Sequence, residues 1–192
     1  MKLITFSVFY FVAVIIIAHF FAPAAYQWRY NTISDLAAQG LPNQWMMQVG
    51  FIGFGLLLNI GFVRKSAAAH KLFFPDVLIM LYGLAVLMSG IFSARPFLAD
   101  VSYSVQEDAL HSFFAQTAGI LFSLGILYRL IVAPSPQEKL FHLVFLVLVM
   151  GTSMLFMLDE TSAVAIGRGL IQRVLYLVSF VWLLIGQYWL TL

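Results

Sequence analysis

The sequence lacks cysteine, and that absence removes several kinds of chemistry at once. Without a thiol the chain can form no disulfide, offers no thiolate metal ligand and has no cysteine nucleophile. Charge is scarce as well, because Asp, Glu, Lys and Arg supply only 9% of the 192 residues. Ordinary globular domains carry about 25% charged residues. A water-soluble fold with so little charge could not cover its own surface, so composition excludes this class of protein.

Basic clusters, internal repeats and low-complexity tracts are also missing. The formal net charge is +2, and the Lys and Arg residues are scattered along the chain without forming a run. Nucleic-acid partners and polybasic lipid-binding segments need such a run. The sequence therefore predicts no nucleic-acid partner, and it leaves the oligomeric state open.

What the sequence does hold is long apolar blocks, with 62% hydrophobic residues and a mean hydropathy of +0.97. A helix that crosses the hydrocarbon core of a membrane needs about 20 mostly apolar residues. Six stretches meet this length, so we expect one all-α domain over residues 1–192, a polytopic transmembrane bundle of six helices. The predicted spans are Leu3–Ala22, Gln44–Val63, Pro75–Ala94, Asp108–Val132, Lys139–Leu158 and Gly169–Leu192.

The first span also has the outline of a secretory signal peptide, because Lys2 precedes the apolar run and Ala22-Pro23-Ala24 follows it. The apolar region of such a peptide has about 7–15 residues. This run is long enough to fill a whole bilayer. We therefore favour an uncleaved first helix and keep cleavage as the alternative.

The loops between the spans carry a modest charge bias that sets the expected orientation. Cytoplasmic loops of membrane proteins hold an excess of Lys and Arg. The bias predicts an N-in/C-in topology, and the compact loops and short termini suit a bacterial cytoplasmic membrane. On this topology six basic residues lie inside and four outside: Lys2, Arg64, Lys65, Lys71, Arg129 and Lys139 against Arg29, Arg95, Arg168 and Arg173.

Small residues recur on three of the spans at spacings that favour helix packing. Transmembrane helices associate where small side chains let their backbones approach. We expect these stripes to face the bundle interior. They are Gly50, Gly53 and Gly55 in the second span, Ala85, Ser89 and Ser93 in the third, and Ala115, Gly119 and Ser123 in the fourth.

Two ionisable residues open the fourth span. Asp108 and His111 are three residues apart, so they share one face of a helix. Ala115, the start of the small-residue stripe, follows His111 by one turn. The spacing predicts an inward-facing pair at the outer mouth of the bundle, in which Asp108 orients His111 as a general base.

The sixth span begins with a second polar group, Gln172 and Arg173. An arginine at this depth is expected to pair with one of the outer carboxylates. Ser34 and Asp35 in the first outer loop, Arg95 at the end of the third span, His19 and the acidic pair Asp159-Glu160 lie at a similar depth. We expect one polar cluster to gather these groups, with Arg173, Gln172 and Arg95 binding a substrate.

Each of these residues has a plainer interpretation. Thr32-x-x-Asp35 fits a capping box, Asp108 can complement a helix N-terminus, and Arg173 can extend its head group to the membrane surface. His19 is more often a hydrogen-bonded histidine at a helix end than a catalyst. The two histidines expected on the inner side are predicted to be interfacial, and they are His70 and His142.

Together these motifs resemble those of a family. The chain has Ile33-Ser34-Asp35-Leu36, a glycine-rich second span, Asp108-x-x-His111, and Gly169-x-x-Gln172-Arg173. This order resembles the six-helix membrane proteins grouped as domain of unknown function 998. The resemblance implies the six-helix fold and a shared site made of Ser34, Asp35, Asp108, His111 and Arg173, and it brings no activity.

A more distant likeness is to the ceramidase and progestin-receptor-like membrane hydrolases, which hold zinc with histidines and an aspartate. Those proteins use a His-x-x-x-His pair near the end of the chain, and no two histidines here are four residues apart. A zinc site usually needs three or four protein ligands. We therefore expect no metal site, and no motif identifies a cofactor.

Three classes of function remain open, all with membrane lipids as the expected partners. The first is a hydrolase or transferase that acts on a lipid headgroup, with His111, Asp108, Asp35 and Ser34 as catalytic residues. The second is a lipid- or small-molecule-binding protein or a transporter, although no charge lies at the middle of any span. The third is an accessory subunit whose polar cluster joins the outer helix ends.

Overall fold

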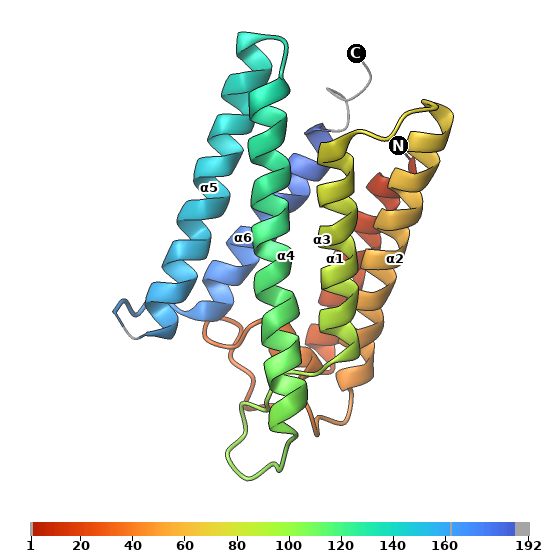
Figure 1. The fold of residues 1–192 in the computed structure, drawn as a ribbon. Helices are drawn as coiled ribbons and strands as arrows, with labels where there is room; N and C mark the ends of the chain where they lie inside the picture. The colour runs from red at the N-terminus through yellow and green to blue at the C-terminus, as the bar shows by residue number, and fades with distance from the viewer. Residues whose placement is uncertain (1, 162, 187–192) are drawn as a thin grey trace.

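The computed structural model describes residues 2–161 and 163–186, and within this part of the chain it contains helices and loops and no strand. Six helices are long and apolar enough to cross a membrane, so the expected all-α, multi-pass membrane fold is confirmed. Figure 1 shows them in chain order, with a short 3₁₀ helix between the first two. The elements are α1 (Lys2–Phe20), η1 (Ser34–Ala37), α2 (Gln44–Ala68), α3 (Phe74–Ile91), α4 (Val105–Val132), α5 (Pro136–Glu160) and α6 (Arg168–Gly186).

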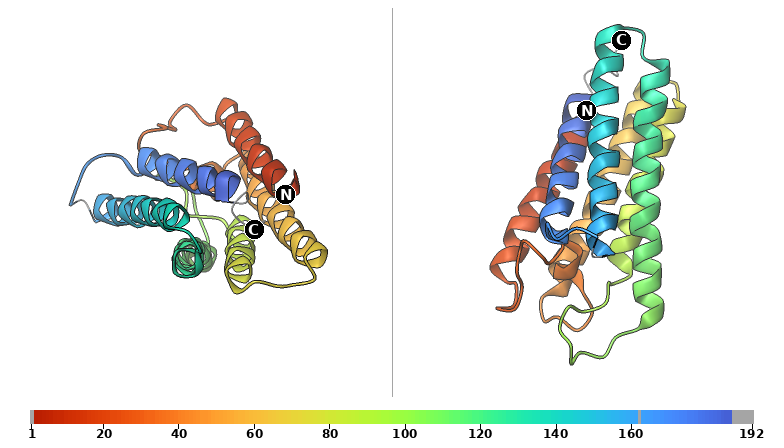
Figure 2. Two further views of the ribbon diagram at one scale, coloured as in Figure 1. Left: turned by 90° about the horizontal axis from the view of Figure 1, so that it is seen from above. Right: turned by 90° about the vertical axis from the view of Figure 1, so that its left-hand side faces the viewer.

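Each helix runs antiparallel to the next, and α6 returns to contact α1, so the bundle closes (Figure 2). We call the end with η1 and the loops at 21–43, 92–104 and 161–167 the η1 end. The opposite end holds the start of α1, the loops at 69–73 and 133–135, and the end of α6.

Several helix limits differ from the predicted spans for local reasons. α2 continues through Arg64 and Lys65 to Ala68, because long cationic side chains are good helix formers whose head groups reach the membrane surface. α4 and α5 begin earlier because Ser104 and Ser135 accept hydrogen bonds from the N–H groups of Glu107 and Glu138 (3.3 and 3.2 Å). α1 and α3 end at Phe20 and Ile91, short of the predicted Ala22 and Ala94. The predicted end of the sixth span, 187–192, lies outside the described residues.

Aromatic rings fill the interior between the helices. Phe11 stacks on Phe54 with ring centroids 4.9 Å apart, and Phe122 meets Tyr82 at 4.9 Å and Trp182 at 5.2 Å. Phe11, Phe54 and Phe122 are fully buried. These contacts join α1, α2, α3, α4 and α6 around one core.

The small-residue stripes of α2 and α3 do face the bundle. Ala85, Ser89 and Ser93 are buried. A Cβ added at Gly55 would meet the carbonyl oxygen of Gly83 and lie 2.7 Å from Cβ of Leu87, so the two backbones touch here. This close approach is what small residues permit in a membrane.

The stripe on α4 is an exception to that expectation. Ala115 is exposed, Gly119 and Ser123 are half-buried, and a Cβ added at Gly119 would meet nothing within 4 Å. The buried face of α4 runs instead through His111, Ala118, Phe122, Gly125 and Ile126. Gly125 on this face allows the close approach to α3, because a Cβ added there would lie 2.6 Å from Cδ1 of Ile79.

Candidate functional site

The seven predicted site residues all lie at the η1 end, but they form two groups. In the first, the Gln172 side chain of α6 holds the turn that precedes η1. Its Oε1 accepts a hydrogen bond from the N–H of Ile33 (2.6 Å), and its Nε2 lies 3.5 Å from Oγ of Ser34. The Ser34 hydroxyl also lies 2.9 Å from that of Thr32. Gln172 and Ser34 are therefore brought together in this group.

Asp35 belongs to the same group, and its carboxylate is used by the backbone. Oδ2 accepts a hydrogen bond from the N–H of Thr32 (2.7 Å) and a longer one from the side chain of Asn31 (3.4 Å). The Thr32 hydroxyl in turn accepts from the N–H of Asp35 (3.1 Å). This reciprocal pair is the bonding of a capping box. The plainer of the two interpretations of Asp35 therefore accounts for its contacts.

Arg173 joins α6 to α1 and to the loop between α1 and η1. Its Nη1 donates to the carbonyl oxygens of Asn31 (3.1 Å) and Gly169 (2.7 Å). Its Nη2 donates to the Tyr26 hydroxyl (2.6 Å) and to Nε2 of His19 (2.7 Å). A guanidinium has five N–H groups, so four are already engaged. The expected pairing with a carboxylate is absent among the described residues, because carbonyl, phenol and imidazole acceptors take its place.

Tyr26 completes this group, and no motif in the sequence pointed to it as a site residue. Its hydroxyl donates to the carbonyl oxygen of Thr32 (2.9 Å) while it accepts from Arg173. Burial raises the pKa of the Tyr26 phenol above its ordinary value, Arg173 opposes the rise, and the charge of Asp35 adds to it. The phenol therefore stays protonated and keeps its role as a donor.

The second group surrounds the chain segment that leaves α3. Nδ1 of His111 lies 2.8 Å from the carbonyl oxygen of Ser89 and 3.0 Å from that of Phe92. Carbonyl oxygens only accept, so Nδ1 carries a proton, and in the neutral tautomer with this proton the lone pair lies on Nε2. His111 is 5% exposed and faces inward, as predicted. Its hydrogen bonds satisfy two of the carbonyls that a helix C-terminus leaves open.

Asp108 does not act on His111 in this arrangement. Its Oδ1 accepts a hydrogen bond from the backbone N–H of Arg95 (2.9 Å), and no hydrogen bond joins Asp108 to His111 among the described residues. The same segment is held from the other side by Gln39, whose Nε2 donates to the carbonyl oxygen of Ser93 (2.9 Å). The segment from 92 to 95 is therefore fixed by three separate side chains.

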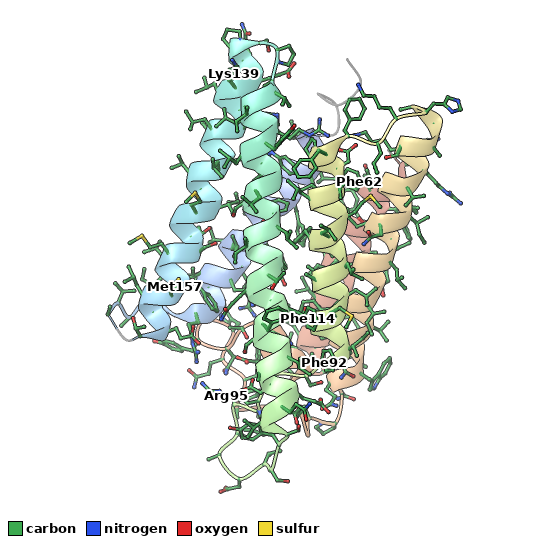
Figure 3. All side chains as sticks on the ribbon, in the orientation of Figure 1. Phe62, Phe92, Arg95, Phe114, Lys139 and Met157 are labelled. Atoms are coloured by element: carbon green, nitrogen blue, oxygen red, sulfur yellow. The ribbon has the colours of Figure 1, made fainter. Side chains whose placement is uncertain are left out.

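This fixed segment presents the side chain of Arg95 at the η1 end (Figure 3). Arg95 is exposed, and its guanidinium has no hydrogen-bond or ion-pair partner in the part of the chain that the structure describes. A ring contact between Phe97 and Tyr26, with centroids 5.9 Å apart, connects the loop after Arg95 to the first group.

Two other acidic side chains at the η1 end, those of Asp159 and Glu160, have partners nearby. Asp159 accepts hydrogen bonds from the N–H groups of Ile166 (2.8 Å) and Gly167 (2.9 Å). Arg168 lies 3.8 Å from Glu160 in an exposed pair. Among the residues described, no three His, Asp or Glu side chains gather as metal ligands. The carboxylates of Asp35, Asp108 and Asp159 thus bind backbone N–H groups, and the charges of Arg95 and Arg173 are left without a paired carboxylate.

Comparison with known families agrees with the motifs. Residues 6–186 match the family described as "Protein of unknown function (DUF998)", so the chain belongs to this family. No curated protein and no solved structure is detectably similar to the chain, and the likeness to ceramidases gains no support.

Proposed function

We propose that this DUF998 protein binds the phosphate-bearing headgroup of a membrane lipid at its η1 end, with Arg95 as the phosphate-binding residue. One observation carries the proposal: the carboxylates of Asp35, Asp108 and Asp159 accept hydrogen bonds from backbone N–H groups, whereas the guanidinium groups of Arg95 and Arg173 form no ion pair with a carboxylate of the described residues. The backbone that carries Arg95 is held in place, and the planar fork of a guanidinium suits the geometry of phosphate oxygens.

Arg173 has a different role in this proposal from the one that the sequence predicted. With four of its N–H groups engaged, it cannot offer a bidentate fork to a ligand. Instead it positions the loop that carries Tyr26, and it adds positive potential to the site. Gln172 and Ser34 keep the adjoining turn in place. The expected location is a cell membrane, with the η1 end outside.

The proposal is tested by lipid binding to the purified chain in nanodiscs. Replacing Arg95 by Gln should lower the affinity for phosphatidic acid by about tenfold, which corresponds to the loss of one charge-assisted contact of about 1.4 kcal/mol. Arg95→Lys should lose less, because it keeps the charge and loses only the fork. Arg64→Gln is the matched control, since Arg64 is an exposed arginine at the opposite end. Equal affinity of the wild type and Arg95→Gln would contradict the proposal.

A second candidate, a hydrolase or transferase acting on that headgroup, is favoured by one observation. The hydrogen bonds at Nδ1 of His111 leave Nε2 as an oriented base. This candidate predicts that one lipid species changes in mass or abundance in membranes that contain the wild type and not in membranes with His111→Ala at equal level. Identical lipid profiles would leave binding as the function that the site supports.

A further inference from the structure

A second cluster of charged side chains lies at the opposite end of the bundle, where α2 and α4 end and α3 begins (Figure 1). Asp76 in the first turn of α3 is 1% exposed. Its Oδ2 accepts a hydrogen bond from Nζ of Lys65 on α2 (2.8 Å), and its Oδ1 is in direct contact with Nη2 of Arg129 on α4. The single negative charge of Asp76 thus pairs with two cations, so these three side chains together carry one excess positive charge.

Both cations keep donors that this pairing does not use. Lys65 spends one of its three N–H groups on Asp76, and Arg129 spends one of its five. The two side chains are 12% and 13% exposed, so they are accessible only along one edge. A buried cation with unused donors is costly in a membrane unless a partner meets it.

A second carboxylate lies near the cluster without an ion pair or a hydrogen bond to it. Glu138, in the first turn of α5, is 6% exposed and within electrostatic range of Arg129. Its backbone N–H donates to Ser135, but the return bond of a capping box, from the N–H of Ser135 to the Glu138 carboxylate, is not formed. Among the described residues that carboxylate has no hydrogen-bond or ion-pair partner.

Two aromatic side chains, one on α5 and one on α6, border the cluster. Nδ1 of His142 accepts a hydrogen bond from the indole N–H of Trp182 (3.1 Å). His142 is 2% exposed, so the expectation of an interfacial position was wrong: the side chain faces the core because Trp182 satisfies it there. A cavity of about 10 Å³ separates Trp182 from Asp76 and Arg129, which is room for about one water molecule.

We propose that this cluster is a second lipid site, and that it takes a headgroup carrying both a phosphate and a primary ammonium. The phosphate binds the free donors of Arg129 and Lys65 at their exposed edge. The ammonium binds the Glu138 carboxylate. This ligand class uses every unpaired charge of the cluster, whereas an anionic headgroup would leave Glu138 without a partner and add a repulsion. The source of the headgroup is a membrane phospholipid, because the cluster sits at helix ends within the bundle.

The test measures lipid binding to the full chain in detergent by native mass spectrometry, in an Arg95→Gln background so that the η1 end does not contribute. Dioleoyl phosphatidylethanolamine, phosphatidylcholine and phosphatidylglycerol are compared at equal concentration. The ethanolamine lipid should bind about tenfold more tightly than the other two. Glu138→Gln should remove this preference and leave the binding of phosphatidylglycerol unchanged or stronger.

Two controls separate a binding role from a structural one. Glu138→Gln must retain the melting temperature of its parent, and if it does not fold, Glu138→Ala replaces it with the same expected loss of preference, because it also removes the carboxylate. Soluble glycerophosphoethanolamine should compete only weakly, because it lacks the acyl chains that bring the lipid to the site. Equal binding of the three lipids, or an unchanged preference in the Glu138 variant, would overturn the proposal. Strong competition by the soluble headgroup would overturn its assignment to a membrane phospholipid.

Discussion

Arg173 connects three parts of the chain through a single side chain. It meets α1 at His19, the following loop at Tyr26 and Asn31, and its own helix at Gly169. Lysine carries the same charge, but its three donors radiate from one nitrogen and cannot reproduce a planar fork. Residue 173 therefore needs the hydrogen-bond geometry of arginine more than it needs a positive charge.

We expect Arg173→Lys to lower the stability of the protein in detergent by about 1–3 kcal/mol, the range for losing hydrogen bonds to a charged group. Arg168→Lys is the matched control, because Arg168 forms only an exposed pair with Glu160, and such pairs contribute about 0–1 kcal/mol. Thermal unfolding followed by size-exclusion chromatography measures both variants. Equal melting temperatures for the two would show that the Arg173 contacts do not stabilise the fold.

The polar residues illustrate which parts of a site the sequence can predict. Thr32 and Asp35 are three residues apart, so their mutual bonding could be read from spacing alone. Asp108 and His111 have the same spacing, yet each side chain binds backbone groups of a different segment. Spacing fixes which helix face a residue occupies, and it does not say which backbone groups of other elements lie opposite.

At the scale of helices, α2 and α3 are held together by glycines, and α4 has a glycine that contacts nothing. Gly55 lies against the backbone of α3 at Gly83, while Gly119 has no atom within 4 Å of an added Cβ. Both residues occur in spans with recurrent small side chains, so the sequence alone treats them alike. The structure separates them because their neighbours differ.

The two glycines give a paired prediction. Gly55→Leu should push α2 and α3 apart and cost about 1–3 kcal/mol, as overpacking of a filled interior does. Gly119→Leu should change stability by less than about 0.5 kcal/mol, because the added side chain has room. Melting temperatures and yields of folded protein from membranes measure both. Comparable losses for the two variants would contradict the assignment of the α4 stripe to open space.

Hydropathy predicts the elements well and their mutual contacts poorly. Runs of apolar residues located all six helices, because a membrane requires that length of apolar chain whatever the packing. The charge cluster of the opposite end escaped prediction, since Lys65, Asp76 and Arg129 lie on three helices and share no motif. In the sequence, the one indication of this cluster is that Asp76 and Glu138 place carboxylates in the first turns of apolar spans.

For the molecule as a whole, the absence of cysteine allows a direct test of orientation. Single cysteines at Asp100, in a loop of the η1 end, and at Lys71, in a loop of the opposite end, would each be the sole thiol in the chain. The charge bias predicts that a membrane-impermeant maleimide labels Asp100→Cys in intact cells and labels Lys71→Cys only after the membrane is opened. The reverse pattern would place the η1 end inside and would exchange the leaflets assigned to the two proposed lipid sites.

The helix α5 is the least enclosed of the six, with 17% of its most apolar stretch buried inside the bundle. Most of its side chains therefore face outward from the bundle, and lipid tails at such positions would distinguish poorly between Leu, Val, Ile and Met. Natural variation along α5 is then expected to be wide in identity and narrow in hydropathy, except on the line of Glu138, His142, Leu146 and Val149 that faces the other helices. In this family, selection would preserve the overall hydropathy of α5 and the identity of those four residues. The other residues of the helix would be free to change from one apolar type to another.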